Sequence, residues 1–492
     1  MFHLHGIPDL GFLRRSLRAS SSEISDKASC ESTQAIQTIS LELPSSSSTQ
    51  ELSAAVFPVS GFSENGDSEA EKERENNLEL ETRKEMVFDL VSDAELVAVP
   101  PGSRYHVGMF TGKNWAPTLL MECGYAISVN DIPKLQQLMW IINEVSSPYG
   151  DCDQRLASCF LQAFFYRFTG TGVKHYNTLC CAAEKSSSYN ERRRILLKCQ
   201  EALPYMTFGH VVANGALMEV LQQEPKVHIV DISSTFCSQW PTLLETLAMQ
   251  PGKAPQVRLT VITFSKDQPP ELIMQDVGSR LTKFARLMGI PFEFKVVQQM
   301  ELEKLHPSMM DLRSDEALVI NCIQSVHLVP DYVADGVRSR DRFLSVLHSA
   351  SPKVLTILEI DQNMSDADFV ISYSNTLRFF ATFFDSLEGN FPRASRERMV
   401  LERICTRSMV SSLACDRSIN SVRRQQDSSQ WCVRLKNAGF TSYTLSKETV
   451  DDVGALLKRY KEGWGHFQGD DGFLYLTWRG QRTAFASAWK PR

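Results

Sequence analysis

A short apolar run near the middle of the chain limits the folds that are open to it. Residues 227–231 read VHIVD, a mostly β-branched stretch that ends in an acid. Such a run is typical of a strand that is buried on both faces of a parallel sheet. A polar loop follows, and Pro241 then lies near the first turn of an amphipathic helix with leucines on one side. Strand, loop and helix in this order form the first unit of a nucleotide-binding α/β fold, in which ligands bind at the carboxyl edge of the sheet.

The loop after this strand lacks the residues that a nucleotide needs. A dinucleotide or S-adenosylmethionine site requires glycines, so that the backbone can approach the cofactor, and residues 232–239 contain none. The next predicted strand, 257–263, also ends without the Asp or Glu that would bind a ribose. Ser233, Ser234 and Cys237 lie in the loop without a glycine elbow or a paired base. The sequence therefore predicts the architecture of a cofactor-binding protein with no cofactor and no catalytic residue.

Downstream, apolar strands alternate with helical patterns. Right-handed crossovers would place these strands in a Rossmann-like, mostly parallel sheet. Two final segments joined by a short turn predict an antiparallel hairpin, which gives the topology of S-adenosylmethionine-dependent methyltransferases. The expected strands are 257–263, 292–297, 317–323 and 354–360, the expected helices are about 275–288, 340–349 and 368–387, and the hairpin strands are 473–478 and 483–488.

Composition divides the chain into three regions. Residues 1–110 are rich in serine and glutamate, and we expect disorder there because such stretches bury too little apolar surface. The arginines and serines of the first two dozen residues leave two interpretations, an organelle transit peptide or a solvated tail. Residues 111–225 predict successive helices, with Asn130 and Asp131 as N-cap candidates for one helix and Asp151 for the next. Residues 226–492 contain the predicted α/β core.

Charge and cysteine content exclude some classes of function. Lys and Arg number 52 against 58 Asp and Glu, so the net charge of −6 does not favour tight binding of nucleic acid by the whole chain. The 12 cysteines show no C-x-x-C and no zinc-finger spacing, and we expect buried free thiols in a reducing compartment. No apolar run is long enough to span a membrane.

Ordered motif blocks resemble those of the plant GRAS transcriptional regulators. Two leucine-rich repeats would flank the first block, at about 115–170 and 240–290, and residues 146–151, 230–233 and 459–464 are similar to the SHORT-ROOT subgroup. One departure is Ile232, where many members of the family carry Phe. The matching residues are Val227, His228, Ile229, Val230 and Asp231 for the VHIID signature, then Gln239, Trp240 and Pro241, then Phe391, Pro392, Arg393, Glu397 and Arg398 for the PFYRE region, and Ser487, Ala488 and Trp489 for the SAW region.

The resemblance, which covers about 110–492, implies a function as well as a fold. It implies a helical cap on a methyltransferase-like core without known catalysis. It also implies regulation of transcription in the nucleus, with the cytoplasm left open as a second location. The implied partners are another GRAS protein, in a heterodimer, and zinc-finger proteins of the INDETERMINATE DOMAIN type, with indirect contact to DNA. Two alternatives remain at this point, a small-molecule methyltransferase and a module that binds DNA directly.

Two groups of residues are candidates for a partner interface. The apolar residues Leu119, Leu120, Leu135, Leu138 and Ile142 predict either an intramolecular core or a face for a partner helix. The basic run of Arg192, Arg193 and Lys198 predicts either a solvated helix face or a stripe that binds an acidic peptide or DNA phosphates. For His228 we expect a satisfied core position, and for Asp231 an acceptor that holds the following loop.

Overall fold

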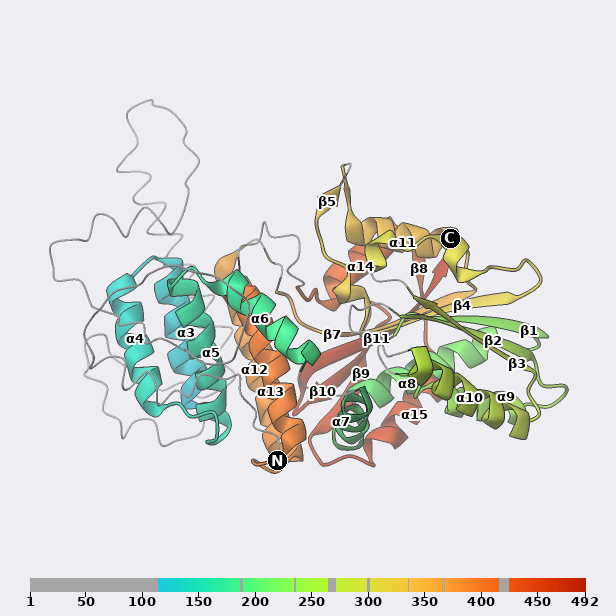
Figure 1. Cartoon of the computed structure of the whole chain (residues 1–492), viewed down its shortest axis with the longest axis horizontal. Coiled ribbons are helices and arrows are strands. Elements are labelled where there is room, and N and C mark those ends of the chain that lie inside the picture. Colours follow the sequence, from blue (N-terminus) through green and yellow to red (C-terminus); the bar gives the residue numbers. More distant parts are fainter. Residues whose placement is uncertain are drawn as a thin grey trace. The chain divides into compact units, whose positions relative to one another are not determined.

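The computed structural model describes residues 114–185, 189–233, 236–263, 271–298, 301–334, 336–364, 366, 368–415 and 424–492 (Figure 1). The predictions made for residues 1–110 therefore lie outside the described residues, and so does the side chain of Arg192.

A mixed sheet forms the centre of the described chain. Its strands β3, β2, β1, β4 and β7 are parallel, and β11, β10 and β9 continue the sheet in antiparallel pairs, with β8 paired to β11. The predicted parallel sheet with a C-terminal hairpin is therefore confirmed, while β8 and β9 were not predicted. The bounds are β1 Lys226–Asp231, β2 Gln256–Thr263, β3 Phe292–Gln298, β4 Ala317–Ile323, β7 Val354–Ile360, β8 Phe440–Tyr443, β9 Trp464–Gln468, β10 Leu474–Trp478 and β11 Gln481–Pro491.

Helices cover both faces of this sheet because its central strands are apolar on both sides. Every residue of β4 is buried, as are the last five of β1. Helices α11 (Ser339–Ser349) and α14 (Ser428–Asn437) contribute to an apolar cluster on one face. Figure 1 shows α8 (Tyr205–Val220), α9 (Trp240–Met249), α10 (Glu271–Leu287) and α15 (Lys447–Leu457) on the other side. Gly209 lets α8 approach β7 closely, because a Cβ there would lie 2.4 Å from Leu358 Cδ2.

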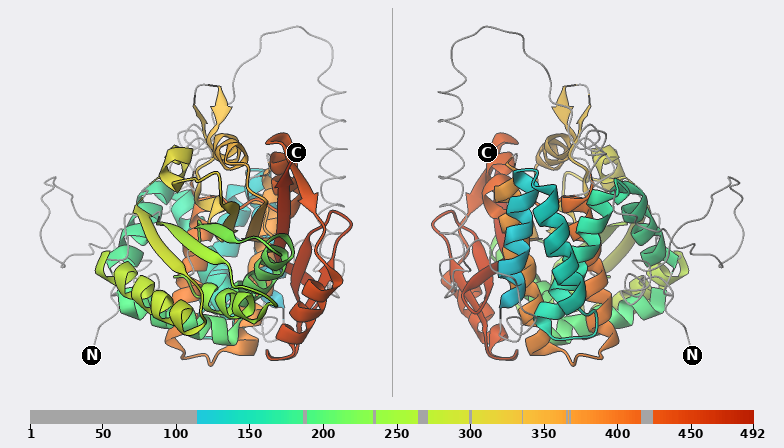
Figure 2. Two further views of the ribbon diagram at one scale, coloured as in Figure 1. Left: turned by 90° about the vertical axis from the view of Figure 1, so that its right-hand side faces the viewer. Right: turned by 90° about the vertical axis from the view of Figure 1, so that its left-hand side faces the viewer.

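A second group of helices, here called the helical subdomain, combines segments from both halves of the sequence. Helices α3 (Trp115–Ser128), α4 (Ile132–Val145), α5 (Cys152–Phe168) and α6 (Gly172–Lys185) are joined by α12 (Phe369–Asn390) and α13 (Arg396–Leu413), as Figures 1 and 2 show. Tyr373 of α12 packs against Phe160 and Phe164 of α5, because the aromatic face of α12 needs an apolar partner. The range 111–225 is thus supplemented by two later helices, while α8, within that range, packs on the sheet.

The aspartates that the sequence places before two helices act as N-caps. The Asp131 carboxylate accepts from the Lys134 amide at 3.0 Å, and Asp151 forms a capping box with Gln154. Among the described residues, no helix combines the length and the apolar character that a membrane crossing requires. The remaining elements are helix α7 (Tyr189–Ala202), the short strands β5 (Val333–Ala334) and β6 (Val337–Arg338), and the 3₁₀ turns η3 (Leu302–Lys304), η4 (Pro307–Met310) and η5 (Val326–Leu328).

Candidate functional site

The carboxyl edge of β1 is occupied by hydrogen bonds among the protein's own side chains. Trp240 Nε1 donates to Asp231 Oδ2 at 2.8 Å, and Asn321 Nδ2 donates to Asp231 Oδ1 at 3.1 Å. All three residues are buried. Burial raises the pKa of Asp231, while its hydrogen bonds act in the opposite direction. The prediction that Asp231 is an acceptor that holds the following loop is confirmed.

Gln239 extends this network to the neighbouring elements. Its Nε2 donates to Asn214 Oδ1 of α8 at 2.9 Å, and its Oε1 accepts from Asn321 at 3.1 Å. Thr356 of β7 donates to Asn321 Oδ1 at 2.8 Å. The residues Gln239 and Trp240 therefore pin the start of α9 to the sheet, at the position where nucleotide-binding α/β proteins place a ligand.

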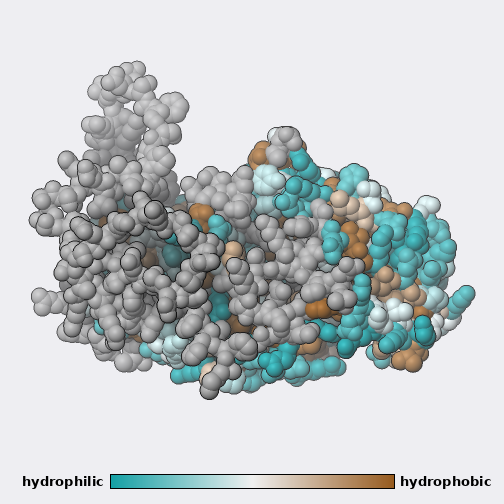
Figure 3. Space-filling model, viewed as in Figure 1, coloured by the Kyte–Doolittle hydropathy of each residue, from teal (hydrophilic) through white to brown (hydrophobic). Residues whose placement is uncertain are grey.

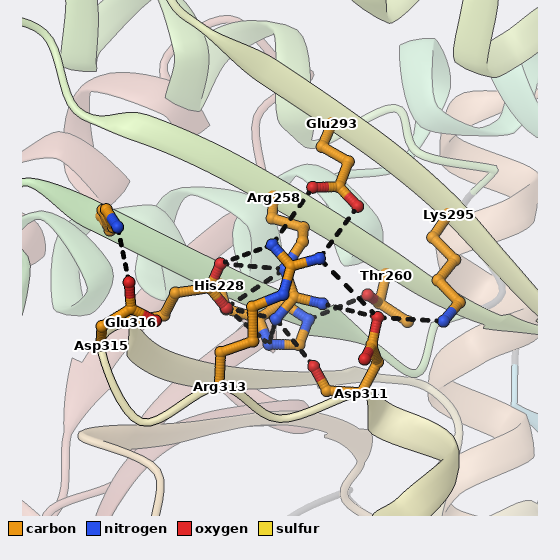
Figure 4. A network of polar contacts seen from close by, with 10 residues as sticks. His228, Arg258, Thr260, Glu293, Lys295, Asp311, Arg313, Asp315 and Glu316 are labelled. Carbon is orange, nitrogen blue, oxygen red and sulfur yellow. Dashed lines mark hydrogen bonds and ion pairs between the residues drawn. The ribbon is translucent and has the colours of Figure 1, made fainter.

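The histidine of the signature strand lies in the amino-terminal half of β1, and Figure 4 shows the polar contacts around it. His228 Nδ1 is 3.0 Å from a guanidinium nitrogen of Arg258, and Nε2 is 2.9 Å from Thr260 Oγ1. Because arginine only donates, Nδ1 accepts and Nε2 donates to Thr260. Burial and then the Arg258 charge lower the pKa of His228 to about 4. His228 is a neutral, satisfied core residue, as predicted.

Arg258 is held in turn by carboxylates from the turn before β4. Its Nε lies 3.0 Å from Glu316 Oε1, and another nitrogen contacts Glu316 Oε2. Asp311 Oδ2 is 3.3 Å from Arg258, and Lys295 of β3 is 3.1 Å from the same oxygen. The pKa of Asp311 is lowered, first by its hydrogen bond to Lys295. This network ties β1, β2, β3 and the turn before β4 together, and every charge that surrounds the histidine has a partner within it.

Arg398 of the PFYRE-like region belongs to a partly buried ion-pair network in the helical subdomain. Arg398 Nε donates to Glu402 Oε1 at 2.7 Å, and Arg155 of α5 donates to Glu402 Oε2 at 2.8 Å. Arg398 also lies 2.7 Å from Glu388 of α12. Burial works against the ionisation of Glu388, but Arg398 and Arg393 hold its pKa below the ordinary value. The network fixes α5, α12 and α13 relative to one another.

The SAW-like residues are part of the sheet core. Ser487, Ala488 and Trp489 are buried in β11, which pairs with β7 and with β10 or β8 on its other side. Trp489 Nε1 donates to Ser487 Oγ at 2.9 Å, and the ring packs edge-on against Phe473. Val227, Ile229 and Val230 are buried in β1 in the same way. In contrast to these buried motif residues, Pro392 and Arg393 of the PFYRE-like region are exposed.

The apolar candidate residues form an intramolecular core, which was the first of their two interpretations. All of them are buried inside the chain, because α3 packs against α4, α5 and α12. They form a core, and the prediction that these side chains meet a partner is corrected. The residues are Leu119, Leu120, Leu135, Leu138 and Ile142.

An exposed face of α4 was missed by the sequence analysis. Trp140 is 58% exposed, whereas every other described tryptophan is buried or half-buried. It lies in an exposed stripe with Pro133, Gln137 and Glu144, at helical spacing. The signal was present in the sequence, because Trp140 is out of phase with the apolar positions 135, 138 and 142.

The basic candidates have different surroundings. Lys198 forms an ion pair with Glu397 of α13 at 3.4 Å, so this part of the run contacts the chain itself. Arg193 instead lines an open cavity of about 290 Å³. The cavity lies between α7, the residues before α9, and α10, and we call it the α7–α10 groove. Its lining residues are Arg193, Leu196, Leu197, Phe236, Cys237, Ser238, Pro241, Val277, Arg280, Leu281 and Phe284.

No group of three His, Cys, Asp or Glu among the described residues could hold a metal ion. The described cysteines are free thiols, and most are buried or half-buried, although Cys181 is exposed. Figure 3 shows that the visible described surface is mostly hydrophilic with separate apolar patches.

Comparisons with known proteins agree with this geometry. A model of the GRAS domain family matches residues 116–490. Protein SHORT-ROOT of Arabidopsis thaliana is 42% identical over 394 residues, which cover 77% of this chain and 73% of that protein. The Scarecrow-like transcription factor PAT1 of the same plant is 32% identical over 375 residues, covering 75% of each chain. The crystal structure of SCL7 in Oryza sativa is 26% identical, with a TM-score of 0.66, and covers 76% of this chain and 99% of that one.

Proposed function

Because the chain belongs to the GRAS domain family and is a non-enzymatic, SHORT-ROOT-like transcription regulator, we propose that it acts in the nucleus by binding other proteins. One partner is another GRAS protein, bound through the helical subdomain. The others are zinc-finger DNA-binding proteins of the INDETERMINATE DOMAIN type, which carry the sequence-specific contact to DNA. The net charge of −6 supports an indirect contact, since direct binding draws on basic surface.

The exposed stripe on α4 is the observation that carries the GRAS pairing. A tryptophan that leaves more than half of its side chain in water is an unusual feature of a soluble surface, and tryptophan is enriched among the residues that dominate binding energy. The opposite face of α4 is buried in the helical subdomain, so the stripe has a rigid support. An interface here would use Trp140 as its central anchor.

The test compares two equally exposed apolar residues. The full chain and its Trp140→Ala and Val433→Ala variants are incubated with plant nuclear extract, and the recovered proteins are identified by mass spectrometry. Val433 is also 58% exposed, but it lies on α14. Circular dichroism of each variant is measured to check that it is folded.

We expect the wild type and Val433→Ala to recover GRAS and zinc-finger proteins, and Trp140→Ala to recover at least tenfold less of the GRAS protein, since removal of an anchor costs about 2 kcal/mol or more. Equal recovery by both variants would place the GRAS interface elsewhere. If the folded wild type recovers neither class, the proposed function is wrong.

A further inference from the structure

A polar cavity of about 400 Å³ lies where the helical subdomain meets the α/β core. It is formed by the loop after β7, the middle of α12, the start of α14 and the turn between β10 and β11, and we call it the β7–α12 pocket. The small ligands of proteins usually occupy pockets of about 300–1,000 Å³, so this volume is sufficient for a small metabolite. The pocket shares no lining residue with the α7–α10 groove.

Charged side chains of both signs line this pocket without neutralising one another. Asp361 and Asp427 supply two carboxylates, and Arg378 and Arg482 supply two guanidinium groups. Within the part of the chain that the structure describes, none of the four forms an ion pair. Because opposite charges attract, a ligand that carries both signs would supply the partners that these groups lack.

The acidic side of the pocket is held in place by main-chain hydrogen bonds. Asp361 Oδ1 accepts from the Ser428 amide at the start of α14 at 2.9 Å, and the Asp361 amide donates to the Thr483 carbonyl of β11 at 3.1 Å. Asp427 is the N-cap of α14, and its Oδ1 accepts from the Gln430 amide at 2.9 Å. Burial raises the pKa of Asp361, and the Asp427 charge acts in the same direction. A cationic group near the two carboxylates would relieve this repulsion.

The basic side of the pocket is open to solvent. Arg378 of α12 donates to the Asn375 amide oxygen at 2.7 Å, and this neutral acceptor leaves the charge of the guanidinium group unbalanced. The guanidinium group of Arg482 lies over the Tyr475 ring, 4.1 Å from its centroid, and such a contact positions a cation without neutralising it. Both arginines are exposed, so their nitrogens are available to a carboxylate.

One buried donor at the pocket also lacks an acceptor. Gln362 follows Asp361 in the loop after β7 and is only 3% exposed, and its Nε2 has no hydrogen-bond partner within the described chain. A buried donor without an acceptor costs about 1–3 kcal/mol. An acceptor atom brought to this wall of the pocket would remove that cost.

We propose that the β7–α12 pocket binds a free α-amino acid, with the ammonium group of the ligand at Asp361 and Asp427 and its carboxylate at Arg378 and Arg482. This site goes beyond the proposed function, which requires no small molecule. Helix α12 belongs to the helical subdomain, whereas β7 and α14 belong to the α/β core, so a bound amino acid would stabilise the junction of the two.

Thermal unfolding of the full chain, with each of the common L-amino acids at millimolar concentration, identifies the ligand. A molecule that binds only the folded chain raises its Tm, and we expect this for at least one amino acid. Isothermal titration calorimetry then compares that amino acid with its N-acetyl derivative and with its C-terminal amide, each of which lacks one charge. We expect both derivatives to bind at least tenfold more weakly. If no amino acid raises the Tm, or if either derivative binds as tightly as the amino acid, the inference is wrong.

Two variants and a matched control locate the bound amino acid. Arg378→Gln and Asp427→Asn each remove one charge from the pocket, and asparagine keeps the N-cap of α14. Arg286→Gln changes an exposed α10 arginine outside the pocket. Thermal unfolding without ligand checks that each variant is folded. We expect at least tenfold weaker binding for each pocket variant and less than threefold change for the control. Unchanged binding by either folded pocket variant would refute the assignment of the site.

Discussion

Glu402 is shared by two buried arginines, and its removal should be costly. Its two carboxylate oxygens accept from Arg398 at 2.7 Å and from Arg155 at 2.8 Å, and both guanidinium groups are almost completely buried. In Glu402→Ala the two positive charges stay in the interior without the carboxylate that they share. Removing one partner from a buried ion pair costs about 3–5 kcal/mol. Because domains are stable by only about 5–15 kcal/mol, this change should bring the fold close to its limit.

The measurement is urea unfolding followed by tryptophan fluorescence, with Glu397→Ala as the control. Glu397 lies on the same helix, where it pairs with Lys198, whose side chain is 53% exposed, and accepts from Ser395 Oγ at 2.9 Å. Its loss should therefore cost only about 1 kcal/mol. Glu402→Gln keeps the shape and one acceptor oxygen, and we expect an intermediate effect. If Glu402→Ala is no more destabilising than Glu397→Ala, the network does not hold α5 against α13 and the reasoning fails.

Two further predictions concern the signature strand and its loop. Trp240→Phe removes a hydrogen-bond donor to the buried Asp231 carboxylate and should lower the free energy of unfolding by about 1.5–3 kcal/mol. Trp489→Phe loses only a hydrogen bond to the neutral Ser487 hydroxyl and should lower it by about 0.5–1.5 kcal/mol. Thermal unfolding compares the two variants, and equal losses of stability would argue that Asp231 is uncharged. The pKa of His228 falls from 6.5 to about 4 on folding, so between these values the unfolded chain binds more protons and stability decreases as pH falls. By pH 5 the free energy of unfolding has fallen by about 2 kcal/mol. In His228→Gln the free energy of unfolding should therefore depend less on pH. If its pH dependence is the same as that of the wild type, His228 is not held neutral in the folded chain.

The sequence predicts elements whose signals are local and apolar. Strand β1 was recognisable from five consecutive residues, and the caps of α4 and α5 from Asp131 and Asp151. Strand β9 was missed because it lies at the sheet edge and its half-exposed Trp464–Gln468 segment, with glycine and histidine in it, shows no alternation. Its pairing with β10 is what makes it a strand.

Contacts between residues that are distant in the sequence could not be predicted from the sequence. The surroundings of His228 depend on Arg258 and Glu316, which are 30 and more residues away, and only the arginine within an apolar strand gave a hint. In the same way, the apolar residues of α3 and α4 fit either a core or a partner face until α12 is seen beside α3. The groove brings together α7 and α10, which are far apart in the sequence.

The return of α12 and α13 to the first helices has a consequence during protein synthesis. Helices α3 to α6 leave the ribosome early, but Phe160 and Phe164 of α5 can pack against Tyr373 only after α12 has emerged. Until then the nascent chain carries an apolar face of α5 that chaperones can bind. A fragment that stops before residue 369 keeps this face permanently. Such fragments should bind many proteins without specificity, so interaction mapping by C-terminal deletion would assign partners to α3–α6 that the complete chain does not bind.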